Sequence, residues 1–130
     1  MAKNVVFLTG ESIGTGASES IHLYRRIASF KKCGDVSIIT QSTDTYPEQA
    51  GCKQVLHLDS QGTNQERAVS VVKQADMFVV VGMAPNSHPS AALLGATRLG
   101  CSIVIIYKGS MDMPNEVHRE HVLRIRDMSI

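Results

Sequence analysis

Five short apolar runs, each bounded by glycine or polar turn residues, constrain this sequence more than any other feature. They are rich in valine and isoleucine, and they are apolar at consecutive rather than alternate positions. Continuous apolarity predicts strands buried on both faces, as in a parallel sheet covered by helices. The runs span residues 5–8, 36–39, 55–58, 77–81 and 103–107.

The segments between these runs carry helical signals. Ser18 can cap a first helix that ends near Gly34. Asn64 can cap a second helix, and Pro89 stands at the first-turn position of a third that runs to Leu99. The alternation predicts an α/β fold with a three-layer, doubly wound, Rossmann-like parallel sheet in a single domain. We expect about six strands in the order 3-2-1-4-5-6.

Composition and charge exclude several classes of protein. Hydrophobic residues make up 43% of the 130 positions and charged residues 19%, which is typical of a globular domain. The formal net charge is +1 and no basic run occurs, so we expect no nucleic-acid partner. The three cysteines lie far apart without a CxxC pair, so we expect no metal and no disulfide framework.

The beginning of the sequence leads directly into the first apolar run. That run has about five residues, too few for a signal peptide or a membrane span. We therefore expect a cytoplasmic protein with no membrane partner.

Two loops at the expected reversal of strand order carry a glycine at their first or second position. They read TGESIGTGAS at residues 9–18 and GMAPNSHPS at residues 82–90. In doubly wound sheets a ligand binds beyond the carboxyl ends of the strands at this point. Glycines let the backbone approach a ligand, and the helix that follows each loop directs its positive end toward an anion such as pyrophosphate. The alternative is that these are ordinary turns, since glycine-rich turns follow strands throughout such folds.

The first loop is not a P-loop. Ala17 and Ser18 follow Gly16, where the GxxxxGK[ST] pattern needs a lysine. Its glycines are also spaced GxxxGxG rather than GxGxxG. Hydrolysis of ATP through a Walker motif is therefore excluded.

Three segments resemble sirtuin motifs and follow one another in the sirtuin order. VVFLTG (residues 5–10) with SIHLYR (20–25) is similar to VVLTGAGIS…SGIPTFR. ITQSTD (39–44), AG (50–51) and VLHLD (55–59) are similar to ITQNID…AG…VIELHG. ADMFVVVG (75–82) with PSA (89–91) is similar to ADLVIVVGTSLxVxPAA. The resemblance implies a Rossmann-like fold that binds NAD.

The end of the sequence allows two interpretations. A helix could run from Asn115 to Arg126, or residues 121–126 could form a sixth strand. These last residues are similar to the sirtuin segment ADLVIRGDA, and the strand is the expectation that we adopt.

The departures from the sirtuin pattern bear on the reaction. That family carries a zinc-binding small domain inserted into this core, and this chain has no zinc cysteines for one. Asp59 stands where the resemblance places the histidine base, and His57 lies two residues earlier. Further replacements are Ser42 for an asparagine, Ala84 for a serine and Tyr107 for an asparagine. Protein deacetylation is therefore not expected.

Two aspartates are the catalytic candidates for cleaving the nicotinamide–ribose bond. Asp44 matches the sirtuin aspartate beside the nicotinamide site, and Asp59 could orient water or contact a ribose hydroxyl. Aspartate is a weaker base than histidine by roughly 3.5 kcal/mol, although burial can raise its pKa. The alternative for Asp44 is a cap on the segment around residues 46–50. His57 is interpreted as a hydrogen-bonded core histidine.

The binding candidates come from both loops and from the matched motifs. Arg25 matches the arginine of the sirtuin FR pair and would meet phosphate or ribose, unless it is an ordinary solvated helix arginine. Glu11 would oppose a highly anionic ligand. The full set is Gly10, Glu11, Ser12, Tyr24, Arg25, Gln41, Ser42, Gly82, Met83, Ala84, Ser87 and Tyr107.

Two hypotheses for function follow. In the first, the chain binds NAD or an ADP-ribose-containing nucleotide as its small-molecule partner, with or without glycohydrolase or ADP-ribosyl-transfer chemistry. In the second, it is a non-catalytic NAD-binding or assembly subunit. A homo-oligomer or a partner chain could then cover the surface on which sirtuins carry their small domain.

Overall fold

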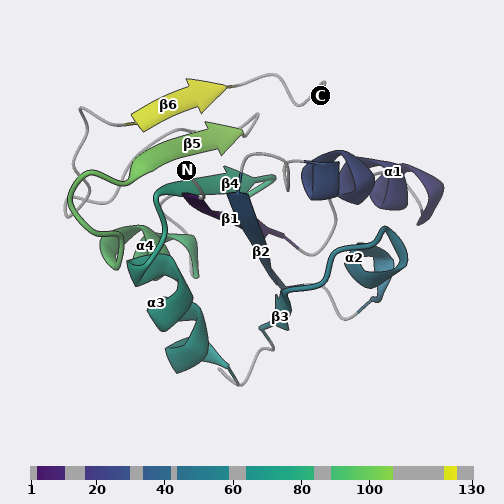
Figure 1. Cartoon of the computed structure of the whole chain (residues 1–130), viewed down its shortest axis with the longest axis horizontal. Coiled ribbons are helices and arrows are strands. Elements are labelled where there is room, and N and C mark those ends of the chain that lie inside the picture. Colours follow the sequence, from purple (N-terminus) through teal and green to yellow (C-terminus); the bar gives the residue numbers. More distant parts are fainter. Residues whose placement is uncertain are drawn as a thin grey trace.

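Six parallel strands form the centre of the molecule, in the order β3-β2-β1-β4-β5-β6 (Figure 1). The computed structural model describes residues 3–10, 17–29, 34–41, 44–58, 64–83, 89–106 and 122–125. The strands are β1 (Lys3–Thr9), β2 (Gly34–Thr40), β3 (Val55–His57), β4 (Met77–Val81), β5 (Ser102–Ile106) and β6 (Val122–Ile125). The predicted strand order and the strand interpretation of the C-terminal segment are both confirmed.

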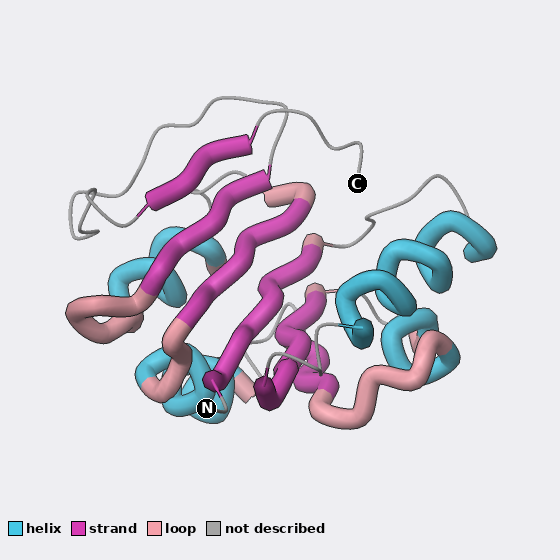
Figure 2. Tube along the Cα trace, turned by 45° about the horizontal axis from the view of Figure 1, so that its top comes forward, coloured by secondary structure: helices cyan, strands magenta, loops and turns pink. Residues whose placement is uncertain are grey.

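Two pairs of helices cover the two faces of the sheet (Figures 1 and 2). They are α1 (Ala17–Ala28) and α2 (Tyr46–Gln49) on one face, and α3 (Gln65–Lys73) and α4 (Ser90–Gly95) on the other. The predicted three-layer architecture is therefore confirmed. None of the described helices is long and apolar enough to cross a membrane.

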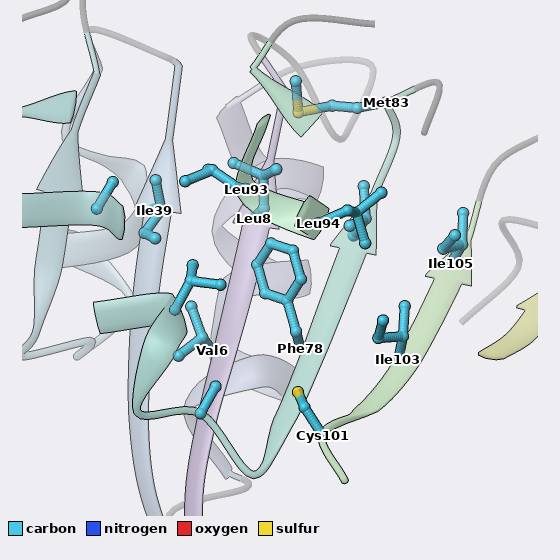
Figure 3. Close-up of a cluster of buried hydrophobic side chains, with 14 of the residues drawn as sticks. Val6, Leu8, Ile39, Phe78, Met83, Leu93, Leu94, Cys101, Ile103 and Ile105 are labelled. Carbon is cyan, nitrogen blue, oxygen red and sulfur yellow. The ribbon is translucent and has the colours of Figure 1, made fainter. Parts of the chain in front are cut away.

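The larger of two apolar clusters lies between the sheet and the helices α3 and α4 (Figure 3). Phe78 of β4 is fully buried at its centre, with Leu93 and Leu94 of α4 packed over it. The smaller cluster, on the α1 and α2 face, includes Tyr24 and Ile27. Because strand residues alternate between the two clusters, continuous apolarity in the sequence corresponds to burial on both faces.

The two predicted N-caps, Ser18 and Asn64, have different places in the structure. α1 begins at Ala17, so Ser18 lies inside the first turn, where serine is tolerated because those N–H groups lack intrahelical acceptors. Asn64 does occupy the N-cap of α3, with a left-handed φ of 70° and no side-chain cap bond. Its amide instead donates a 3.0 Å hydrogen bond from Nδ2 to the carbonyl of His57.

The predicted third helix is shorter than its sequence pattern. α4 ends at Gly95, four residues before Leu99, and Pro89 is its N-cap rather than its first residue. The Thr97 hydroxyl donates to the Leu94 carbonyl at 2.7 Å and so satisfies one of the last helical acceptors. Gly100 has a φ of 88° in the turn that leads to β5.

Candidate functional site

The register of the sheet brings three strand ends level at one edge. Thr9 at the end of β1 pairs with Thr40 of β2 on one side and with Val81 of β4 on the other. Beyond β2, the Gln41 N–H donates to the Thr9 carbonyl at 3.2 Å. Beyond β4, the Gly82 N–H donates to the Ile106 carbonyl at 2.9 Å. We call this the carboxyl edge, and here the strand order reverses between β1 and β4.

Gly10 lies in close contact with the loop that leaves β4. A Cβ at position 10 would lie 3.1 Å from Met83 Cγ and 3.4 Å from the Gly82 carbonyl oxygen. Gly82 itself has a φ of 74°, in the left-handed region that glycine adopts most readily. The backbones of the two loops therefore meet at the point where a doubly wound sheet places its ligand.

A buried hydroxyl network supports this edge from the α1 face. The Tyr24 hydroxyl of α1 lies 2.8 Å from Thr9 Oγ1, and Tyr24 is only 2% exposed. Burial raises the pKa of Tyr24, against the opposing effect of its hydrogen bonds to the Thr9 and Thr40 hydroxyls. The negative charge of Asp44 raises the pKa further. Tyr24 is thus a neutral hydroxyl that joins the ends of β1 and β2.

Asp44 introduces the short helix α2. Its Oδ1 accepts a 3.0 Å hydrogen bond from the Tyr46 N–H, while the N-cap residue Thr45 makes no side-chain cap bond. Asp44 therefore satisfies a backbone N–H at the start of α2, as the capping alternative expects, but it lies one residue before the N-cap. The same carboxylate is half-buried and acts electrostatically on Tyr24, so it also lies near the carboxyl edge.

His57 ends β3 and contacts α2. Its Nε2 lies 2.7 Å from Glu48 Oε2, and the two side chains are 34% and 43% exposed. The prediction of a hydrogen-bonded histidine is confirmed, but the prediction of a core position is wrong. β3 is the outermost strand of the sheet and only three residues long, so its last side chain stays accessible to solvent.

The remaining candidates fall in three places. Gln41 is half-buried at the edge, and Met83 is buried in the larger cluster at 7% exposure. Arg25 is exposed on α1 without an ion pair among the described residues, so its role stays a prediction. Seven candidates lie outside the described residues: Glu11, Ser12, Ser42, Asp59, Ala84, Ser87 and Tyr107.

Sequence reasoning missed the structural threonines of the edge. Thr9 and Thr40 are both fully buried and both end an apolar strand. A polar residue at the end of a buried run is the signal that could have found them, because a buried hydroxyl needs a partner. Within the part of the chain that the structure describes, no three His, Cys, Asp or Glu side chains gather where a metal ion could bind.

The strand order and the glycine contact define a Rossmann-like α/β domain, and comparison with solved structures narrows the fold to that of the sirtuins. A structure from work on sirtuin substrate affinity superposes with a TM-score of 0.72 and 15% identity, over 96% of this chain and 89% of that one. Sir2Af2 bound to a myristoylated histone peptide gives 0.71 and 15%, over 98% and 87%. A Sir2 homologue in complex with ADP-ribose gives 0.68 and 15%, over 98% and 87%.

The similarity between this chain and the sirtuin structures is a similarity of fold. No family model and no curated protein sequence matches this chain. At 15% identity the structural neighbours confirm the predicted sirtuin-like architecture, including the strand order around the carboxyl edge.

Proposed function

We propose that this chain binds NAD, or another nucleotide that contains ADP-ribose, at the carboxyl edge between β1 and β4. The observation that carries the proposal is the reversal of strand order between β1 and β4, where a doubly wound sheet places its ligand and where the loops that begin near Gly10 and Gly82 meet. Sir2 structures of this fold are described as complexes with NAD and with ADP-ribose. Both molecules contain the same pyrophosphate, which would be the common element of recognition.

The hydroxyl network beneath the edge supports the proposal. The hydrogen bond between Tyr24 and Thr9 anchors the end of β1 to α1, so the loop that follows Thr9 begins at a fixed point. A preorganised site loses less conformational entropy on binding, and that loss otherwise subtracts from affinity. In this arrangement Tyr24 contributes by fixing the edge, and the backbone near Gly10 and Gly82 would contact the phosphates.

Calorimetric titration with NAD and with ADP-ribose tests the proposal, with adenosine as the ligand that lacks phosphate. We expect heat from both pyrophosphates and much weaker binding of adenosine. Two matched variants locate the site, since Gly82→Asp and Gly82→Asn have the same shape and differ in charge. Both residues tolerate the left-handed backbone better than other side chains do. Gly82→Asp should bind at least about tenfold more weakly than Gly82→Asn, because its carboxylate would face a phosphate.

The outcome that contradicts the proposal is specific. If the folded wild-type chain gives no heat with either ligand at millimolar concentration, the carboxyl edge is not a nucleotide site. If the two Gly82 variants bind equally well, the phosphates lie elsewhere.

Cleavage of the nicotinamide–ribose bond is an extension of this proposal. Asp44 is the described carboxylate that reaches Tyr24 electrostatically, and a carboxylate near the sugar could stabilise a developing oxocarbenium ion. Asp44→Asn keeps an oxygen that can accept from the Tyr46 N–H, so the turn into α2 survives while the charge is lost. Incubation with NAD and chromatography for free nicotinamide measures the activity. If Asp44→Asn and Asp59→Asn both keep full activity, neither aspartate is catalytic.

A further inference from the structure

A hollow lies on the face of the sheet opposite Tyr24, where β2 and β3 meet α3. It has a volume of about 320 Å³. Its floor is apolar and is formed by Ile39 of β2, Leu56 of β3 and Val71 of α3. Ile39 and Leu56 are register partners, so their side chains lie next to each other on the same face. We call this space the β3 hollow.

A polar side chain at the β3 hollow is held in a fixed orientation. The Ser37 hydroxyl donates a 2.7 Å hydrogen bond to Gln54 Oε1, and both residues line the hollow. This bond uses the acceptor of the Gln54 amide. The amide Nε2 therefore remains as a donor group beside the apolar floor.

Two cations complete the lining. Lys53 precedes β3, and Arg67 lies one helical turn before Val71 on α3. Both are exposed, and neither side chain has an ion pair or a hydrogen bond with the residues that the structure describes. No carboxylate is among the described residues that line the hollow. Glu66 lines an adjoining, shallower depression together with Ser70 and with two residues of the β3 hollow, Arg67 and Val71.

We propose that the β3 hollow binds a small amphipathic carboxylate, with its apolar part on the Ile39–Leu56–Val71 floor and its charged group toward Lys53, Arg67 and Gln54. An apolar floor with a few convergent polar groups is the usual composition of a small-ligand site. The volume stands at the lower end of the range for such sites, roughly 300–1,000 Å³, and fits a chain of about eight carbons. Lys53 and Arg67, which have no ion pair with the described residues, favour an anion over a neutral ligand.

Octanoate is a suitable probe, and 1-octanol is its neutral counterpart. In a titration of the isotopically labelled full chain followed by NMR, octanoate should shift the amide resonances of Ser37, Gln54 and Val71 in a saturable way. A ligand of this size should bind with a Kd of about 1 mM. 1-Octanol should bind more weakly, because it leaves both cations without a partner.

Charge-neutral variants of the cations provide the second measurement. Arg67→Gln and Lys53→Gln should each weaken octanoate by about three- to fivefold, the effect expected for partly solvated ion pairs. Lys73→Gln is the matched control, since it removes a charge from the same helix but does not line the hollow. It should leave the affinity unchanged.

The proposal is overturned if octanoate causes no saturable shifts at ten times the expected Kd, as it would if only a protein segment fits the site. It is also overturned if 1-octanol binds as tightly as octanoate, or if Lys73→Gln weakens binding as much as Arg67→Gln. Shifts confined to Gly10 and Gly82 would place the carboxylate at the carboxyl edge instead and would equally contradict it.

Discussion

The two ends of the sheet differ in how they satisfy their polar groups. At the amino end, the Asp76 carboxylate accepts from the Asn4 N–H at 2.8 Å through Oδ2 and pairs with Arg98 through Oδ1. The Asp76 backbone adds hydrogen bonds to the Asn4 carbonyl at 2.8 Å and from the Ser102 N–H at 3.0 Å. One acidic residue thus ties β1, β4 and β5 together.

The carboxyl edge uses neutral groups instead. Thr9, Thr40 and Tyr24 form a buried hydroxyl network, and Gly10 and Gly82 continue the chain above it. At the amino end a cation already neutralises the carboxylate. At the carboxyl edge the hydroxyl network itself is neutral, and the nearby charge is that of Asp44, which acts on Tyr24. The comparison separates a region in which charged groups hold the strands together from the region where we propose that a ligand binds.

Truncating the tyrosine at the carboxyl edge should have the largest effect on stability. Tyr24→Ala removes a buried ring from the smaller apolar cluster and leaves a cavity, which should lower the free energy of unfolding by about 3–5 kcal/mol. Urea denaturation measures this change. A loss below about 1 kcal/mol would mean that α1 does not pack on the sheet as described.

Removing only the tyrosine hydroxyl should have a smaller, pH-dependent effect. Tyr24→Phe leaves the Thr9 hydroxyl without this partner and should cost about 1–3 kcal/mol near neutral pH. Burial raises the pKa of Tyr24 above its ordinary value of 10.0, so the folded chain holds this proton more tightly than the unfolded chain does. That contribution is complete below pH 10 and is lost as the pH rises through the folded pKa.

The free energy of unfolding measured above pH 10 tests whether the Tyr24 phenol is buried. Above pH 10 the wild type should lose stability more steeply than Tyr24→Phe. Burial also raises the pKa of the Cys101 thiol, but this contribution is common to both chains and cancels in the comparison. Parallel curves would show that the Tyr24 phenol is not buried in the folded state.

Removing the Asp76 carboxylate at the amino end of the sheet should lower stability without changing ligand affinity. Asp76→Ala removes one hydrogen bond to the Asn4 N–H and a partly exposed ion pair, together worth about 1–2 kcal/mol. Asp76→Asn keeps an acceptor for Asn4 and should lose less. Both variants should bind NAD as the wild type does. A loss of NAD affinity in either would mean that the two ends of the sheet are coupled.

The smallest change in stability is expected for Gly10→Ala. The added Cβ would approach Met83 Cγ to 3.1 Å, and a flexible methionine can move, so the cost should stay below about 1 kcal/mol. Nucleotide affinity should nevertheless fall, because the added methyl group lies beside the Gly82 carbonyl, where the phosphates would approach. Thermal unfolding and calorimetry on the same sample separate the two effects. Unchanged affinity would argue against backbone recognition of the ligand at this position.

The sheet was predictable because its signal is local. A run of consecutive apolar residues such as Phe78 to Val81 predicts each buried strand. The order of the strands follows from the rules for doubly wound sheets. Cys52 and Cys101 are buried, as expected for small apolar side chains. The glycines at positions 10 and 82 were found for the same reason, since Gly82 directly follows an apolar run and Gly10 is separated from one only by Thr9.

The features that sequence reasoning missed depend on contacts between distant residues. Tyr24 and Thr9 are 15 positions apart, and neither residue alone predicts a shared hydrogen bond. Asn64 has the residue type of a helix cap, but its side chain donates to His57 on a neighbouring strand. His57 looked internal because its neighbours are apolar, and only the outer position of β3 makes it accessible.

The hydrogen bond from Asn64 to the His57 carbonyl affects how the connection between β3 and α3 would tolerate an insertion. It joins the last residue of β3 directly to the start of α3, so the chain leaves and re-enters the core at one fixed point. The entropic cost of closing a loop between fixed ends grows slowly, by about 0.6 kcal/mol for each doubling of length. A segment inserted between His57 and Asn64 should therefore cost little stability while the sheet keeps its order.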